Sequence, residues 1–109
     1  MQLKTPKVVK AYVQASNDRD VEAFGTLFAE DAIVHDEGTE YRGVAAIRKW
    51  LVSTFEKYAF TLKPIDVSQK ANATILTVQM TGNFPGSPIS THFCFVVHEE
   101  KIASLDIRS

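Results

Sequence analysis

Apolar residues recur every three or four positions in the first half of the chain, and this spacing predicts helices. The pair Thr5-Pro6 suits the start of the first helix, because proline favours the first helical position. A second helix is expected after the cap residue Asp20 and is predicted to end at Glu30-Asp31. The third is expected to follow Tyr41-Arg42-Gly43. The apolar stripes of the three predicted helices are Val8, Val9, Tyr12 and Val13; Val21, Phe24, Leu27 and Phe28; and Val44, Ile47, Leu51 and Phe55.

Alternation of apolar and polar residues predicts strands in the second half of the chain. The expected strands cover residues 60–68, 73–84, 89–98 and 102–107, and a shorter one covers 32–36. Pro64 lacks a backbone N–H and must therefore lie at a bulge or a sheet edge. Helices first and long antiparallel strands later predict an α+β domain, with one curved sheet and helices on a single face.

Both faces of the 89–97 strand are largely apolar, which predicts cover on both sides and hence a homodimer through the sheet. One face carries Ile89, Thr91, Phe93, Phe95 and Val97, and the other carries Ser90, His92, Cys94 and Val96.

The composition is that of an ordinary single globular domain over residues 1–109, with 45% hydrophobic and 23% charged residues. With twelve basic and thirteen acidic residues, the chain has no excess of positive charge that would attract nucleic acid or an anionic membrane, so neither is an expected partner. No run approaches the ~20 apolar residues of a membrane span, and the start MQLKTPKVVK is too polar for a secretion signal. A single cysteine, Cys94, fits a cytoplasmic location.

Asp36 is the first candidate for chemistry. In the 32–36 strand, Val34 and Asp36 share one face, while Ile33 and His35 take the other. A carboxylate above an apolar cavity has a raised pKa and can accept a proton. A solvated aspartate at a strand end fits the pattern equally well.

Tyr12, Asp36 and His92 together suit proton abstraction next to a carbonyl group. Asp36 would take the proton, and Tyr12 and His92 would donate hydrogen bonds to the enolate oxygen. A structural tyrosine and a structural histidine remain alternatives at these positions. Three histidines without ligand spacing do not predict a metal site, and the sequence has neither a phosphate-binding glycine loop nor a nucleophile elbow. No metal or cofactor is therefore expected.

The segment KAYVQASNDRDVEAFGTLFAEDAIVHDEG, the YRGVAAIRKWL helix and the strands up to Ile107 resemble the nuclear transport factor 2-like superfamily. Within it, the chain is most similar to SnoaL-like and ketosteroid isomerase-like proteins. The resemblance implies a cystatin-like cone, in which a curved, mostly antiparallel sheet wraps around three N-terminal helices and leaves a pocket at the open end. It is specific for fold and weak for substrate, because this fold hosts many functions.

Ketosteroid isomerases use an aspartate base, a tyrosine donor and a protonated aspartate donor. The resemblance places the base on Asp36 in VHD, the tyrosine on Tyr12 in KAYV, and the second donor on His92 in STHFCF. It also allows His92 to be the base, with Asp36 as its orienting partner. The pocket residues expected are Trp50, Leu51, Phe55, Leu105 and Ile107.

The leading expectation is a small enzyme of the isomerase or polyketide cyclase type, which acts on a hydrophobic carbonyl compound without a cofactor. The alternatives are a non-catalytic domain that binds a small hydrophobic ligand and a dimerisation domain of the same fold. The enzyme requires Asp36 to titrate with a raised pKa in a pocket. The binding domain requires only the pocket, and the dimerisation domain requires neither.

Overall fold

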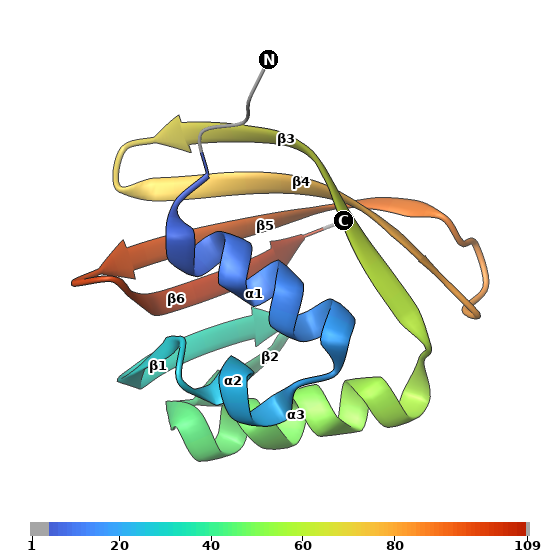
Figure 1. The fold of residues 1–109 in the computed structure, drawn as a ribbon, viewed down its shortest axis with the longest axis horizontal. Helices are drawn as coiled ribbons and strands as arrows, with labels where there is room; N and C mark the ends of the chain where they lie inside the picture. The colour runs from blue at the N-terminus through green and yellow to red at the C-terminus, as the bar shows by residue number, and fades with distance from the viewer. Residues whose placement is uncertain (1–4, 109) are drawn as a thin grey trace.

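The computed structural model describes residues 5–108, which form one curved, unclosed sheet with helices on its concave side (Figure 1). The order of the strands in the sheet is β2-β1-β6-β5-β4-β3. The elements are α1 (Lys7–Asp18), α2 (Val21–Gly25), β1 (Phe28–Asp36), β2 (Thr39–Arg42), α3 (Gly43–Lys57), β3 (Phe60–Lys70), β4 (Ala73–Gly82), β5 (Ile89–His98) and β6 (Lys101–Arg108). Figure 1 shows β3 and β4 curving over α1 while α3 runs along the opposite side.

Strand pairing confirms the predicted α+β class and the mostly antiparallel sheet. All neighbouring strands pair antiparallel except β1 and β6, which pair parallel with Val34 opposite Leu105. This parallel pair joins the N-terminal hairpin to the strands of the second half. It therefore brings the end of β1 next to the interior surface built by β5 and β6.

The second helix is shorter than predicted, and the strand after it is longer. The side chain of Asp20 caps α2 by accepting a hydrogen bond from the Ala23 N–H, as expected, but the helix has only five residues. Phe28 pairs with Ile102 of β6, and the Ile102 N–H donates to the Leu27 carbonyl. The chain is therefore drawn into the sheet four residues before the predicted strand.

The short strand β2 was absent from the prediction. Glu37 and Gly38, with φ of 51° and 77°, form a two-residue turn between paired Asp36 and Thr39. Positive φ at both turn residues is typical of the tight hairpin turns that match strand twist. The hairpin holds Asp36 at the point where β1 ends.

Pro64 of β3 lies at an irregularity of the sheet, as expected for a residue without a backbone N–H. The register with β4 shifts between Pro64 and Asp66, which is typical of a β-bulge. Such a shift bends a strand and increases its twist. The bend contributes to the curvature of β3 and β4 over α1 in Figure 1.

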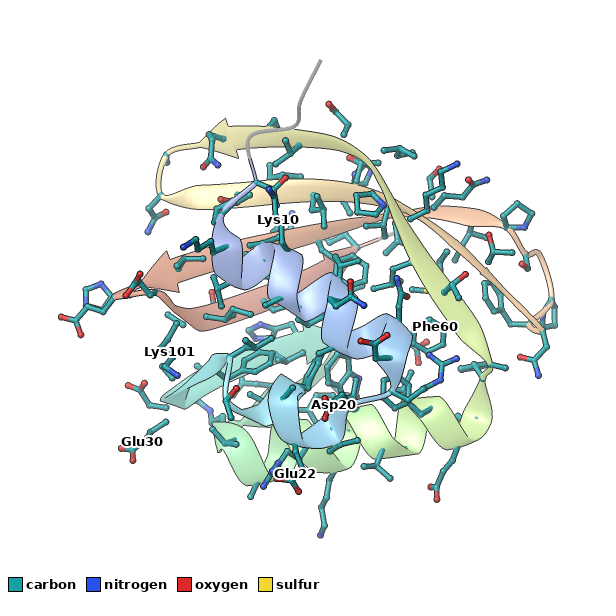
Figure 2. The ribbon with its side chains drawn as sticks, viewed as in Figure 1. Lys10, Asp20, Glu22, Glu30, Phe60 and Lys101 are labelled. Atoms are coloured by element: carbon teal, nitrogen blue, oxygen red, sulfur yellow. The ribbon has the colours of Figure 1, made fainter. Side chains whose placement is uncertain are left out.

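The core lies between the helices and the concave face of the sheet. Phe24, Phe95 and Leu105 are inaccessible to solvent, and Tyr12 packs edge-on against Phe95 with ring centroids 5.2 Å apart. Figure 2 shows Asp20 where the chain enters α2 and Phe60 where β3 begins, on the side of the sheet that carries the helices.

No helix within residues 5–108 is long and apolar enough to cross a membrane.

The convex face of the sheet is only partly apolar. Cys94 and Val96 of β5 are half-buried, while Ser90 and His92 on the same face are exposed. The predicted homodimer through this face stays a prediction.

Gly82 is required where β4 ends beside the start of β3. A Cβ atom at this position would lie 2.3 Å from the Ala59 carbonyl oxygen and 2.9 Å from the Phe60 Cβ. We expect Gly82→Ala to lower the free energy of unfolding by about 1–3 kcal/mol, because the backbone has to move away. Thr81→Ala, at the exposed neighbouring position, should change it by less than about 0.5 kcal/mol in urea unfolding. Equal effects of the two substitutions would contradict this account of Gly82.

Candidate functional site

A cavity of about 430 Å³ lies between α1, α3 and the concave face of the sheet. Its volume is within the range of small-molecule sites in proteins. Its wall is largely aromatic and aliphatic, with few polar groups. The lining residues are Tyr12, Ser16, Asp36, Glu37, Gly38, Trp50, Leu51, Thr54, Tyr58, Phe60, Leu62, Met80, Phe84, Pro85, Ile89, Thr91, Phe93 and Ile107.

Asp36 reaches the cavity because it lies two residues beyond Val34 in β1. Val34 is inaccessible to solvent, and strand alternation turns Asp36 to the same side. The residue between them, His35, is exposed and lies 3.1 Å from Glu40 on the opposite face, as expected. The cavity position of Asp36 thus follows from the core position of Val34.

The environment of Asp36 favours its protonated form. Partial burial raises the pKa of this carboxyl above its ordinary value, and the negative charge of Glu37 raises it further. In the opposite direction, the Trp50 indole N–H donates a hydrogen bond of 3.0 Å to the Asp36 carboxylate. Trp50 therefore fixes the orientation of the carboxylate while burial increases its basicity.

Tyr12 presents a protonated hydroxyl to the same cavity. Its side chain is 2% exposed, and its ring lies 4.8 Å from the Phe24 centroid and 5.8 Å from the Phe93 centroid. Burial raises the pKa of the phenol far above its ordinary value, and the negative charge of Asp36 adds to this effect. No hydrogen bond of the Tyr12 hydroxyl is found in the part of the chain that the structure describes. The hydroxyl is therefore available as a donor to a bound molecule.

The prediction that His92 faces the cavity is wrong. His92 is exposed on the convex face of the sheet, where its Nδ1 lies 3.0 Å from the Thr77 hydroxyl. It pairs with Thr77 in β4 and Arg108 in β6, and the same face carries Cys94. Both roles considered for His92, donor and base, are excluded by this geometry, since the sheet separates its imidazole from the cavity.

Three of the five predicted pocket residues line the cavity, namely Trp50, Leu51 and Ile107. Phe55 and Leu105 do not. Phe55 packs against Phe60, with ring centroids 5.8 Å apart, and lies under the Arg19 guanidinium at 4.7 Å. Leu105 is fully buried in the core, where it pairs with Val34 of β1.

The position expected of His92 is taken by its neighbour Thr91. Thr91 is 4% exposed and lines the cavity between Ile89 and Phe93 on the concave face of β5. Its hydroxyl oxygen has no hydrogen-bond partner among the described residues. The sequence contained a signal for this orientation, because the bulky Phe93 and Phe95 share a face with Thr91, whereas the opposite face carries smaller apolar residues.

Several other lining residues come from segments that the sequence had not connected with a site. Tyr58 follows α3 and Phe84 lies between β4 and β5, and their rings meet edge-on with centroids 6.0 Å apart. The Thr54 hydroxyl donates a hydrogen bond of 2.8 Å to the Trp50 carbonyl within α3, so its proton is already engaged by the backbone of the helix.

No group of three histidine, cysteine, aspartate or glutamate side chains that could hold a metal ion is found within residues 5–108.

The curved sheet with helices on its concave face and a cavity between them is the architecture of the nuclear transport factor 2-like and cystatin-like class of α+β proteins. Within this class, the sequence pattern of the SnoaL-like domain matches residues 9–105. The chain belongs to the SnoaL-like family. No curated protein matches it significantly.

Solved structures of bacterial proteins agree with this assignment. A provisionally named polyketide cyclase from Sinorhizobium meliloti is 31% identical, with a TM-score of 0.92 and 95% of each chain covered. A Catenulispora acidiphila protein with a ketosteroid isomerase-like fold, in complex with trimethylamine, is 21% identical, with a TM-score of 0.85 over 97% of this chain and 87% of that one. A provisionally named SnoaL-like polyketide cyclase from Shewanella denitrificans is 13% identical, with a TM-score of 0.77 over 94% of this chain and 87% of that one. The last two show the fold alone.

The two contacts of Asp36 predict opposite changes in its pKa. Trp50→Phe removes a hydrogen bond to the carboxylate and should raise the pKa of Asp36, whereas Glu37→Gln removes a nearby negative charge and should lower it. Carboxyl ¹³C chemical shifts of Asp36, followed as a function of pH, measure both changes. Shifts of the same sign in the two variants would contradict the proposed electrostatics.

Proposed function

We propose that this protein is a cofactor-independent enzyme that removes a proton from the carbon next to a carbonyl group in a hydrophobic compound. The proposal is supported mainly by one observation: Asp36 and Tyr12, from β1 and α1, line the same largely apolar cavity. A carboxylate is the proton acceptor and a neutral phenol is the hydrogen-bond donor that such a reaction uses. The similarity to the provisionally named polyketide cyclase from Sinorhizobium meliloti and the membership of the SnoaL-like family support this class of reaction.

In the proposed step, a carboxylate oxygen of Asp36 takes the proton as the C–H bond breaks. The electron pair of that bond forms the enolate double bond, and negative charge develops on the carbonyl oxygen. The Tyr12 hydroxyl donates a hydrogen bond to that oxygen and remains protonated itself, because its pKa is strongly raised. In an isomerisation, Asp36 then returns the proton to a different carbon. In a cyclisation, the enolate carbon attacks a second carbonyl, whose π electrons move to its oxygen, and the resulting alkoxide takes the proton from Asp36.

The environment of Asp36 suits a base in this role. A raised pKa brings a carboxyl nearer to the working pH and strengthens it as a proton acceptor. The Trp50 N–H holds one carboxylate oxygen, Oδ2, at 3.0 Å, which leaves the other oxygen, Oδ1, for the substrate. Trp50 is thus a positioning residue for the base.

The cavity wall favours a ring-shaped, hydrophobic substrate. Six aromatic side chains line it, those of Tyr12, Trp50, Tyr58, Phe60, Phe84 and Phe93. Aromatic rings bury large apolar areas and pack well against flat ligands. The substrate class proposed is therefore a cyclic or polycyclic ketone.

Asp36→Asn tests the assignment of the base. In D₂O, the wild-type protein should catalyse deuterium incorporation next to the carbonyl of 2-tetralone, a small bicyclic ketone, and the variant should lose this activity by about 10²–10⁴-fold. The exchange rate should rise with pH through the pKa of Asp36, which lies above its ordinary value of 3.8. Mass spectrometry of the recovered ketone measures the exchange. Asp31→Asn, at an exposed position of the same strand that is outside the cavity, is the matched control.

The same variant should be more stable than the wild type at neutral pH. The folded state raises the pKa of Asp36, so it favours the protonated acid, and this stabilisation is lost as the pH rises through the folded-state pKa. Asparagine resembles the protonated acid and can still accept the Trp50 hydrogen bond. Unchanged exchange in Asp36→Asn would refute the assignment of Asp36 as the base. Absence of exchange with the wild type would refute the catalytic role and leave the ligand-binding domain as the function.

Tyr12→Phe tests the donor. The substitution keeps the ring and its aromatic contacts but removes the hydroxyl, so the exchange rate should fall about 10²–10³-fold while the protein remains folded. Because the donor acts on developing charge, the loss should appear mainly in kcat. A pure increase in KM would instead indicate that the hydroxyl only binds the substrate.

A further inference from the structure

Two buried threonines on neighbouring strands differ in how their hydroxyl groups are satisfied. Thr74 of β4 and Thr91 of β5 both face the concave side of the sheet and are 5% and 4% exposed. The Thr74 hydroxyl donates a hydrogen bond of 3.1 Å to the side-chain oxygen of Gln69. The Thr91 hydroxyl oxygen has no partner anywhere in residues 5–108.

Thr91 lines the cavity, whereas Thr74 does not. The Thr91 hydroxyl oxygen itself is buried and inaccessible to solvent. Thr91 is flanked along β5 by Ile89 and Phe93, which also line the cavity, and it pairs with the buried Val78 of β4. These neighbours are all apolar. A hydroxyl group can donate one hydrogen bond and accept two, and the surrounding side chains offer it none.

We propose that Thr91 is a ligand-binding residue whose hydroxyl donates a hydrogen bond to an acceptor oxygen of the bound molecule. This inference rests on the proposed function for its ligand class, a cyclic ketone, and adds a second donor besides Tyr12. A buried hydroxyl without a partner destabilises the empty protein, and a ligand acceptor removes that penalty. A rotation of about 120° about the Cα–Cβ bond moves the threonine hydroxyl to the position of the methyl group, so the donor can be directed to the ligand without a change in the backbone.

The arrangement predicts an unusual pair of effects for one substitution. Thr91→Val keeps the shape of the side chain and removes only the hydroxyl. It should therefore raise the urea midpoint of the empty protein and at the same time weaken the binding of a ketone. A threonine with a merely structural role would give the opposite change in stability, as expected for Thr74→Val, which breaks an existing hydrogen bond.

Binding is measured by calorimetry with 2-tetralone and with tetralin, the hydrocarbon that has CH₂ in place of the carbonyl group. Thr91→Val should weaken the binding of 2-tetralone about tenfold and leave the affinity for tetralin unchanged. Thr91→Ser, which keeps a hydroxyl, should retain the preference for the ketone. Thr74→Val, the matched control, should lower the urea midpoint and leave the ratio of the two affinities as in the wild type.

A lower urea midpoint for Thr91→Val would overturn the proposal. Equal losses of affinity for 2-tetralone and tetralin in this variant would overturn it as well. Failure of the wild type to prefer 2-tetralone over tetralin would also overturn it. The proposed catalytic function is tested separately by deuterium exchange. A protein that binds 2-tetralone through Thr91 but exchanges none of its protons would contradict the catalysis and support the binding role.

Discussion

Strand alternation connects the core of this protein to its cavity. Val34 and Phe93 are anchored in the core, and the residues two positions away, Asp36 and Thr91, are consequently turned to the same face. Each anchor loses its burial if its strand slips by one residue, so the register is strongly determined. Apolar neighbours thus turn Asp36 and Thr91 toward the cavity, and the Trp50 N–H then orients the Asp36 carboxylate.

The same principle accounts for Tyr12 at helical spacing. Val8 and Ser16 lie one turn before and one turn after it on the buried side of α1, and the aromatic ring is enclosed by Phe24 and Phe95. This rigid side chain also lines the cavity. A donor held by its own ring loses little conformational entropy on binding, which suits preorganised stabilisation of a charge.

Alternation put Asp36 on the face of Val34, and helical spacing put Tyr12 in an apolar stripe, but both patterns left a structural alternative open. The resemblance to ketosteroid isomerases placed both residues in the pocket, where the structure has them. The prediction failed for His92, since both faces of β5 carry apolar residues and alternation alone cannot say which face is buried. The answer depends on pairing with β4 and β6, where Leu76 and Leu105 mark the concave side. The same reason explains the second helix: the pairing of Phe28 with β6 is a long-range contact that local spacing does not contain.

The electrostatics of the cavity link function to instability. Asp36 is ionised less readily than an ordinary aspartate, and the Thr91 hydroxyl is buried without a partner, so the empty protein retains two unfavourable polar groups. Neither group contributes to the core, because the anchors beside them supply the burial. A stable fold would be obtained more easily with apolar residues at both positions. Their presence in one cavity, together with Tyr12, agrees with the function proposed above, in which a bound molecule supplies a proton to Asp36 and an acceptor to Thr91.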